Sequence, residues 1–528
     1  MRLHAESRSL AVYSIRTIAL AALTFALTLS GRAQSSAGNW AWMGGSSVAI
    51  NCKAIPCPEQ AGIYGVEYQF GATSLPGYRY GGATWTGADG RLWMFGGFGF
   101  DANGNSGDLS DLWAFDPRLG AHGKWAWMGG RKTAGPTGTG VYGTQYLSDT
   151  ANLPGARSSS ATWIDANGRL WLFGGVGIDS VGTTGLLNDL WVFDPASGAH
   201  GQWTWISGSK TLPPWTWSGA SGISAAKGAF AATNTPGSRS VPVAWTDASG
   251  RMWLWSGSGY DSKGLWVDLE DWWVFDPAQG AHGEWAWMGG PKAGPLNFSD
   301  PSIHSAEFQF APANMPGFRQ AVSHWEDAKG NLWLFGGLGS DSAGTIAPLN
   351  EVWTYDATKA PYGEWAWAGG VTTITDMGAR GNLPGQRGIF GPKYRFGDTY
   401  VPGARMYGDT WTDSKGRLWL LGGVGVARLG VHGLLNDLWA FDPAKGAHGQ
   451  WAWMGGNDQL WCDSHGCYGR TSVYGTEYVF SPGNVPGGRG SGQSWTDAQG
   501  NLWMFCGTGY DSVGTNGNLR DLWEFRFF

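Results

Sequence analysis

The sequence predicts an all-β fold, and two observations predict it: the composition and an internal repeat. The chain has 528 residues, of which 88 are Gly, 25 are Pro and 36 are Trp. Gly and Pro destabilise a helix interior by about 1 and 3 kcal/mol relative to Ala, so the composition excludes a long-helix architecture. Aromatic residues make up 14% of the chain, which is typical of strands and excludes a disordered protein.

The repeat is a unit that occurs six times along the chain. Each copy begins with Pro-Gly-x-Arg and continues through a Trp, a short turn, a second Trp, a Gly pair and a Trp-containing third run, before a Trp-x-Trp element. The copies begin at Pro76, Pro154, Pro236, Pro316, Pro402 and Pro486. Such regular repetition indicates one structural unit per copy.

Each copy contains four short apolar or aromatic runs separated by turn signals. In the first copy the runs are Tyr80 to Thr86, Arg91 to Phe95, Asp111 to Phe115 and Lys124 to Met128. We therefore expect four antiparallel strands per copy. Six such sheets cannot bury their faces alone, whereas radial stacking buries them, so residues 34–528 are predicted to form a six-bladed β-propeller.

The two ends of the chain predict how this ring closes. The sixth copy ends at Phe528 without its own Trp-x-Trp element, and Trp40-Ala41-Trp42 stands near the other end. We expect a strand at residues 38–45 to join the last blade as its fourth strand. Closure of this kind removes the exposed sheet edges of an open array.

Residues 1–33 have the pattern of a secretory signal peptide. Basic residues precede an uncharged stretch from Thr17 to Leu29, and small residues at positions 31 and 33 follow it. This stretch is shorter than the roughly 20 residues of a membrane-spanning helix. We expect cleavage after Ala33 and export to the periplasm or the extracellular space, without a membrane span in the mature chain.

The five cysteines fit an oxidising compartment. Cys52 and Cys57 are separated by four residues, as are Cys462 and Cys467, which predicts two short disulfide loops. A four-cysteine zinc site is the alternative, which the wide spacing and the export signal disfavour. Cys506 is left over and stands where most copies carry Gly, so we expect an inert core thiol.

These repeats resemble the kelch repeat family. The Gly pairs carry the resemblance, together with the Trp residues of the third and fourth strands; Ser256 and Cys506 replace the first Gly in blades three and six. The resemblance implies a propeller of the galactose-oxidase-like central-domain superfamily. It specifies no function, because members include protein-binding adaptors, galactose oxidase and a sialic acid mutarotase. The copper ligands of the oxidase cannot be placed on this sequence, so no catalytic residue, metal or cofactor is carried over.

Residues that recur in every copy are expected to serve the fold. The six arginines of the Pro-Gly-x-Arg elements are predicted to pair with the acidic residues that open the third strands, rather than to bind an anion. The repeated His of the Gly-Ala-His-Gly turns and the repeated Asp of the loops between second and third strands are predicted to be turn residues. A calcium loop beginning at Asp101 is the alternative for the first copy, but Leu112 stands where a ligating Glu is needed.

Residues that break the repeat are the candidates for function. Strand parity places the long, variable loops on one face, which favours binding there. Trp215, Trp217 and Trp266 lie in such loops around the third blade and are predicted to bind a ligand by stacking. The alternative is that these rings bury one another. Trp255 and Trp272 stand within strands and are expected in the core; Trp461, the remaining extra Trp, lies in the second cysteine loop.

An enzyme remains an alternative. His324 and Glu326 flank Trp325 and project to the same side of a strand, so they could transfer protons. They precede a short turn on the face opposite the long loops, however, and no nucleophile elbow, phosphate loop or metal-binding spacing accompanies them.

The sequence as a whole predicts an exported, monomeric propeller that binds a glycan or a protein with its long-loop face, without a cofactor. A net charge of −6 and the lack of a basic run disfavour nucleic acid as a partner. Two other functions remain open: a carbohydrate-active enzyme such as a kelch-type sugar mutarotase or epimerase, and a purely structural envelope protein.

Overall fold

The computed structural model describes residues 38–52, 55–135, 137–214, 217–293, 300–359, 361–376, 384–463 and 466–528. Within these ranges the chain is all-β, as predicted, with one short 3-10 helix, η1 (Pro58–Gln60). No helix in the described ranges is long and apolar enough to cross a membrane. The predicted signal peptide lies outside them.

Six antiparallel sheets contain the longer strands of the described chain. Sheet 1 consists of β3 (Ala83–Thr86), β4 (Leu92–Phe95), β7 (Leu112–Asp116) and β8 (Lys124–Gly129). Sheet 2 consists of β10 (Ala161–Ile164), β11 (Leu170–Ile178), β12 (Thr184–Asp194) and β13 (Gln202–Ser207), and β9 (Arg157–Ser158) also pairs with β11. Sheet 3 consists of β15 (Val243–Thr246), β16 (Met252–Trp255), β19 (Trp272–Asp276) and β20 (Glu284–Gly289).

The remaining three sheets follow the same order. Sheet 4 consists of β22 (Ser323–Glu326), β23 (Leu332–Phe335), β26 (Val352–Asp356) and β27 (Glu364–Gly369). Sheet 5 consists of β29 (Asp409–Thr412), β30 (Leu418–Val426), β31 (His432–Asp442) and β32 (Gln450–Gly455), with β28 (Arg405–Met406) paired to β30. Sheet 6 consists of β36 (Gln493–Thr496), β37 (Leu502–Phe505), β40 (Asp521–Phe527) and the N-terminal β1 (Gly38–Gly45).

Short strands extend this pattern beyond the four runs read from the sequence. Three-stranded sheets are formed by β2 (Arg79–Tyr80), β5 (Phe98–Phe100) and β6 (Ser106–Asp108); by β14 (Arg239–Ser240), β17 (Ser258–Tyr260) and β18 (Trp266–Asp268); by β21 (Arg319–Gln320), β24 (Leu338–Ser340) and β25 (Ile346–Pro348); and by β35 (Arg489–Gly490), β38 (Thr508–Tyr510) and β39 (Asn516–Asn518). A separate hairpin joins β33 (Trp461–Asp463) and β34 (Gly466–Tyr468). In sheets 2 and 5 the equivalent hairpins are continuous with the longer strands.

The first predicted strand, Tyr80 to Thr86, is wrong as a continuous strand. The chain breaks at Gly81, whose φ is +62°, and β2 therefore pairs with β5 while β3 pairs with β4. The equivalent residues of the other units also have positive φ, although none is Gly: Ser159, Val241, Ala321, Tyr407 and Ser491. The left-handed conformation is therefore imposed by the fold rather than by glycine.

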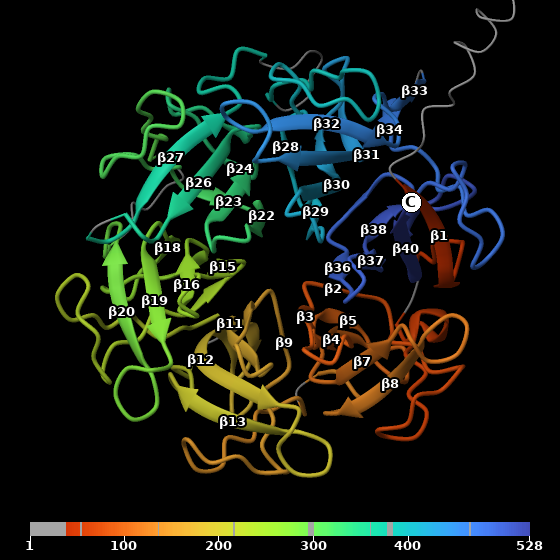
Figure 1. Cartoon of the computed structure of the whole chain (residues 1–528). Helices are drawn as coiled ribbons and strands as arrows, with labels where there is room; N and C mark the ends of the chain where they lie inside the picture. The colour runs from red at the N-terminus through yellow and green to blue at the C-terminus, as the bar shows by residue number, and fades with distance from the viewer. Residues whose placement is uncertain are drawn as a thin grey trace, which may run out of the picture.

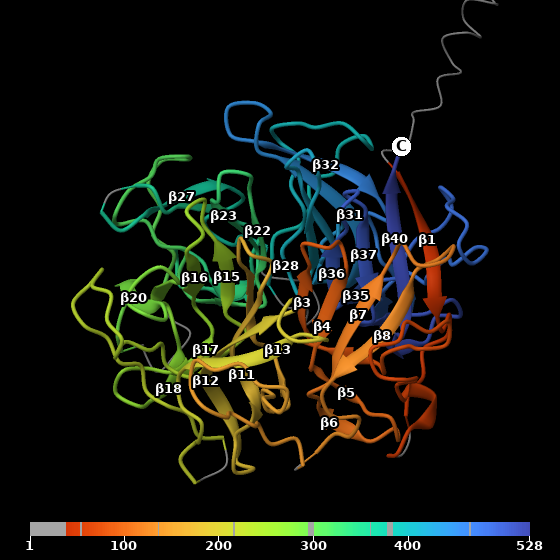
Figure 2. The same ribbon diagram turned by 60° about the horizontal axis from the view of Figure 1, so that its bottom comes forward.

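The sheets are arranged around a common centre, with the first strand of each sheet innermost and strands such as β13, β20 and β8 outermost (Figure 1). The innermost strands contact one another in the order β3, β10, β15, β22, β29, β36 and again β3. We call the end of the sheets at which the second and third strands are joined the long-loop end. The other end, with the turns between first and second strands, is the short-turn end. Figure 2 shows the short hairpins β5–β6 and β17–β18 projecting together toward one side.

The core lies between neighbouring sheets. Buried aromatic and aliphatic side chains form one cluster at each junction, including a cluster that joins Leu92 and Trp113 of sheet 1 to Trp495 and Phe505 of sheet 6. At five junctions, the indole N–H of a first-strand Trp donates to a backbone carbonyl of the next sheet, as from Trp85 to Trp171 at 3.1 Å. These bonds fix the spacing between sheets.

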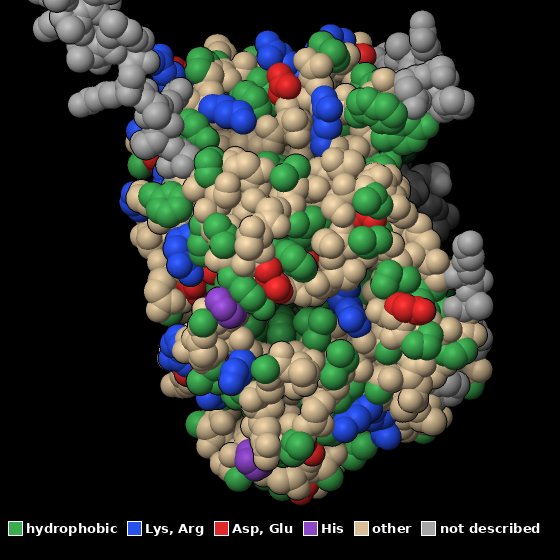
Figure 3. Space-filling model, turned by 90° about the vertical axis from the view of Figure 1, so that its right-hand side faces the viewer, with side chains coloured by type: hydrophobic (Ala, Val, Ile, Leu, Met, Phe, Trp, Pro, Cys, Tyr) green, Lys and Arg blue, Asp and Glu red, His purple; other side chains and the backbone are tan. Residues whose placement is uncertain are grey.

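β1 and β40 bring the two ends of the described chain together. β1 pairs antiparallel with β40, with Trp42 opposite Trp523, and Figure 1 shows the C-terminus beside β1. On the surface that faces the right of Figure 1, charged side chains of both signs are scattered rather than gathered into one patch (Figure 3).

Candidate functional site

Two exposed tryptophans lie together at the long-loop end of sheet 3. The ring centroids of Trp217 and Trp266 are 6.3 Å apart, with an interplanar angle of 41°. The two residues are 50% and 46% exposed. The Tyr260 ring lies 6.0 Å from that of Trp266. We call these three residues the aromatic platform; the third predicted binding residue, Trp215, lies outside the described residues.

Hydrogen bonds hold the aromatic platform in place. The Trp266 Nε1–H donates to Ser258 Oγ at 2.9 Å, and the Tyr260 hydroxyl donates to the Trp217 carbonyl at 2.7 Å. The backbone N–H of Trp217 donates to the carbonyl of Thr184, in sheet 2. The loop before sheet 3 is therefore tied to two sheets while both indole rings keep about half of their surface in solvent.

The other units show that the fold does not need Trp at position 266. Trp266 opens β18 directly opposite Tyr260. The residues at the equivalent paired positions are Ser106, Thr184, Ile346, His432 and Asn516. The position therefore accepts small, polar and aliphatic side chains. Trp255 and Trp272, in contrast, are buried within sheet 3, as predicted.

A second aromatic cleft lies beside sheet 6. Trp461, which is 53% exposed, and Tyr468 have ring centroids 5.6 Å apart on the two strands of the β33–β34 hairpin. Together with Arg470 and Tyr510 they line a cavity of about 500 Å³. Tyr510, in β38, occupies the position in the sixth unit that Tyr260, in β17, occupies in the third. The sequence marked Trp461 only as an extra tryptophan, because the hairpin that presents it could not be recognised from the repeat.

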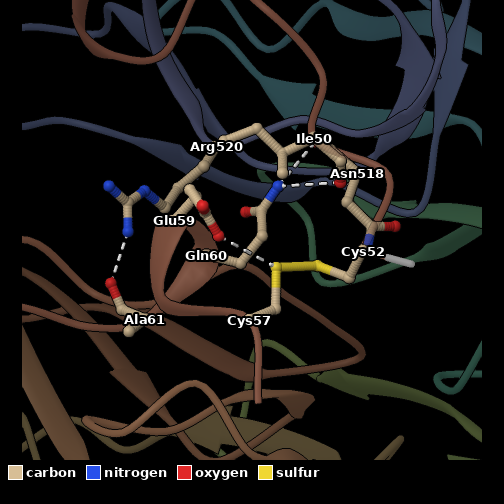
Figure 4. The surroundings of a disulfide bond; sticks show 8 residues. All are labelled: Ile50, Cys52, Cys57, Glu59, Gln60, Ala61, Asn518 and Arg520. Carbon is tan, nitrogen blue, oxygen red and sulfur yellow. Dashed lines mark hydrogen bonds between the residues drawn. A yellow bond between two sulfur atoms is a disulfide. The ribbon is translucent and has the colours of Figure 1, made fainter. Parts of the chain in front are cut away.

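The predicted disulfide between Cys52 and Cys57 is present, with Cα atoms 5.8 Å apart (Figure 4). Next to it, the Gln60 side-chain amide donates to the carbonyls of Ile50 and Asn518, each at 3.2 Å. The bridge thus stiffens a loop that is also bonded to the C-terminal part of the chain.

For the second cysteine pair, the structure describes the backbone pairing of the two residues. Cys462 and Cys467 are directly opposite each other in the β33–β34 ladder. The Cys467 side chain and His465 lie outside the described part, so this bridge stays a prediction. Cys506 is a buried free thiol, as expected, and burial raises its pKa to about 12. Among the described residues no group of three His, Cys, Asp or Glu side chains could hold a metal ion.

The recurring arginines form buried ion pairs, as predicted, and not an anion site. In the first unit the Arg79 guanidinium makes two bonds to the Asp111 carboxylate, at 2.7 and 2.8 Å, and both residues are fully buried. The Trp113 indole N–H and the Tyr64 hydroxyl also donate to this carboxylate. The other pairs are Arg157–Asp189, Arg239–Asp271, Arg319–Glu351, Arg405–Asp437 and Arg489–Asp521.

The repeated His and Asp residues also serve the fold. All four turn histidines lie against aromatic rings of a neighbouring unit: His122 on Tyr478, His200 on Tyr68, His282 on Tyr146 and His448 on Phe308. Asp101 accepts hydrogen bonds from the backbone N–H groups of Asn103, Asn105 and Ala134. Its oxygens therefore bind the turn and a later loop, as expected of a turn residue.

One buried carboxyl, that of Glu270, stands where other units have an Asn that bonds to the next unit. Glu270 is 2% exposed and stands where sheets 2, 4 and 5 carry Asn188, Asn350 and Asn436. The Asn188 side chain donates to the Pro236 carbonyl of the next unit. Burial, with the nearby charge of Asp300, raises the pKa of Glu270 to about 8, so the carboxyl is mostly neutral at pH 7.

A further candidate site lies at the short-turn end, where the innermost strands border a cavity that we call the channel cavity. This cavity of about 560 Å³ is lined by inner-strand residues of sheets 1, 4, 5 and 6. His324 and Glu326 are part of its wall. Burial lowers the pKa of His324 and raises that of Glu326, which still reaches solvent in the channel cavity. The sequence placed these two residues correctly at this end, but it could not show that four sheets line an open cavity around them.

Comparisons with known proteins give no family for this chain. No family model and no curated protein sequence matches it. Among solved structures, the chain is similar to that of YjhT, with 12% identity, a TM-score of 0.44, and coverage of 85% of this chain and 95% of that one. It is similar to a copper-bound fungal alcohol oxidase of the AA5 family (13%, TM-score 0.40, coverage 87% and 76%). It is also similar to a protein of unknown function from Dyadobacter fermentans (10%, TM-score 0.38, coverage 88% and 98%).

Proposed function

We propose that this chain is an exported six-bladed propeller that binds a glycan on the aromatic platform of sheet 3. Three features support the architecture: the cyclic order of inner-strand contacts, the core cluster between sheets 6 and 1, and the pairing of β1 with β40. In this interpretation β1 closes the ring. The signal-like residues 1–33 and the Cys52–Cys57 disulfide support export.

The observation that carries the binding role is the exposure of two neighbouring indole rings, on residues held by the indole N–H of Trp266 and by the backbone of Trp217. Trp217 and Trp266 are each about half exposed, whereas the Trp residues that open the Trp-x-Trp elements are buried in the core, as Trp125 and Trp285 are. Hydrogen bonds restrain both residues, so binding would cost little conformational entropy. Rigid aromatic faces next to polar groups suit the apolar C–H face of a sugar ring.

A glycan fits this platform better than a protein does. A stable protein interface buries about 800 Å² on each partner, which two half-exposed indoles and a Tyr ring cannot supply. Leu265 is also exposed beside Trp266, at 45%, but it is a single aliphatic side chain. A sugar ring needs only one or two stacking residues and a few polar contacts, so the platform has the right size.

The test combines a glycan array with matched variants of the mature chain, residues 34–528. Trp266→Ser gives the third unit the residue that the first unit has at the equivalent position, Ser106, so it should fold normally. We expect it, and Trp217→Ala, to lose glycan binding while the free energy of unfolding changes by less than about 0.5 kcal/mol.

Trp461→Ala is the control, because it removes an equally exposed Trp from another sheet and should leave this binding intact. Unchanged binding by the sheet 3 variants, together with a loss of several kcal/mol of stability, would show that the rings only pack the loop.

A further inference from the structure

In the wall of the channel cavity at the short-turn end, five hydroxyl groups already use their hydrogens within the protein. Each of these hydroxyls donates to a backbone carbonyl of the preceding sheet: Thr410 to His324, Thr412 to Glu326, Ser494 to Thr410, Thr496 to Thr412, and Thr86 to Thr496, at 2.8 to 3.3 Å. A hydroxyl has one hydrogen to donate and two lone pairs to accept. The lone pairs are therefore what these groups can offer to a ligand.

In sheet 4, His324 and Glu326 stand at the two inner-strand positions where other sheets carry these hydroxyl residues. Most other sheets carry hydroxyl or small side chains at the two positions: Thr84, Thr162, Ala244, Thr410 and Ser494 at the first, and Thr86, Ile164, Thr246, Thr412 and Thr496 at the second. The fold is thus satisfied without a titratable group here. A carboxyl that the scaffold does not need, in the wall of a cavity, indicates a ligand.

The carboxylate of Glu326 is only partly satisfied by the protein. Its Oε2 accepts the backbone N–H of Thr246 at 2.8 Å. The hydrogen bonds of the described residues leave Oε1 without a donor. Asp327 and Asp413 also line the cavity, but the turns use their oxygens, as in the 2.7 Å bond from Arg417 to Asp413. Glu326 therefore gives the wall a negative charge, and its Oε1 is the acceptor that the described residues leave open.

No cationic side chain of the described cavity wall balances the Glu326 carboxylate. Among the described residues that line the cavity, none is Lys or Arg. The His324 ring is held neutral by the lowered pKa, so it adds no positive charge. A ligand that complements this wall brings positive charge, because an anion would face the Glu326 carboxylate with no cationic side chain beside it in the described wall. A metal ion is disfavoured, because the described residues provide no group of three strong ligands.

We propose that the channel cavity binds a small protonated primary amine, with its ammonium group on Glu326 and the neighbouring hydroxyl oxygens. An ammonium group has three donors and no acceptor, which complements the wall. A cavity of about 560 Å³ also has room for a sugar ring that carries the amine. This site is independent of the aromatic platform, which lies at the opposite end of the sheets.

Isothermal titration of the mature chain at pH 7 tests the proposal with D-glucosamine, N-acetyl-D-glucosamine and ethanolamine. We expect glucosamine to bind and N-acetylglucosamine, which lacks the charge, to bind at least tenfold more weakly. Ethanolamine separates the two sources of the amine. Binding of ethanolamine as tight as that of glucosamine assigns recognition to the ammonium group alone, and weaker binding shows that the sugar ring contributes. Both results support the site.

The variants locate the binding. Glu326→Thr introduces the residue of sheets 1, 3, 5 and 6, so it should fold, and Glu326→Gln removes only the charge; each should weaken glucosamine binding by about tenfold or more. Glu284→Gln is the control, because sheet 2 carries Gln202 at the equivalent position, and it should leave binding unchanged. Trp266→Ser should also leave it unchanged. Equal binding of glucosamine and its N-acetyl form, or full binding by both Glu326 variants, overturns the proposal.

Discussion

Trp163 and Trp245 offer a direct measurement of the bonds that join neighbouring sheets. They occupy equivalent first-strand positions, and each is 3% exposed. The Trp163 Nε1–H donates to the Trp253 carbonyl of the next sheet at 3.0 Å. The Trp245 Nε1–H is buried and has no acceptor among the described residues. The perturbation is Trp→Phe at each position, which removes the N–H and leaves an aromatic ring.

Both substitutions remove similar volume from similarly buried sites, so the cavity contributions should nearly cancel. Trp163→Phe also loses a hydrogen bond, worth about 1 kcal/mol. Trp245→Phe removes a donor that has no partner, and burial of such a group costs about 1–3 kcal/mol. We therefore expect Trp163→Phe to lose about 2 kcal/mol more stability than Trp245→Phe.

Guanidinium chloride unfolding is the suitable assay. The entropy of unfolding grows with chain length, so 1 kcal/mol would move the Tm of this chain by only about 1 °C. The midpoints should differ while the slopes stay equal, because the exposed surface is the same. Equal losses for the two variants would refute the view that indole-to-carbonyl bonds, beyond packing, hold the sheets together.

Three further predictions concern single features of the chain. Glu270 has a folded pKa of about 8 and an unfolded value near 4.5, so the folded state holds the extra proton and stability falls as pH rises between these values. Glu270→Asn should flatten that dependence and raise stability at pH 8 by an amount on the order of 3 kcal/mol, measured by unfolding at pH 5 and pH 8. The Cys506 thiol should react with a thiol reagent at pH 8 only after unfolding, since reaction in the native state would contradict its burial. Deletion of residues 34–45 should expose the edge of β40 and cause aggregation in light scattering, and a soluble variant with full stability would refute ring closure by β1.

Much of the fold could be predicted from the sequence, because the interactions that define each sheet are local. Consecutive strands are joined by short turns, so the repeat predicts their order and antiparallel pairing. The comparison of six copies also separated the roles of residues correctly: Arg79 and Asp111 pair in the core, and His122 packs on a ring. The break at Gly81 was missed, since the equivalent residues with positive φ are Ser, Val, Ala and Tyr, which carry no local signal of that conformation.

The candidate sites show where sequence reasoning stops. The surplus of tryptophans around the third unit pointed to Trp217 and Trp266, but the exposed fraction of each ring depends on how two loops pack, which no local pattern encodes. Sequence reasoning offered His324 and Glu326 only as an alternative site, because their cavity forms only when the inner strands of four sheets meet.

The sequence by itself thus determined the repeated unit, the all-β class and the residues that depart from the repeat. Each of these follows from strand periodicity and turn chemistry within a short stretch of chain. Only the tertiary structure decided which departures share a site. Thr496 and Thr86 lie 410 residues apart in sequence, yet the arrangement of the sheets sends the hydroxyl hydrogen of one to the carbonyl of the other. That long-range geometry, and not the residue types alone, leaves the wall of the channel cavity with acceptors and one open carboxylate oxygen.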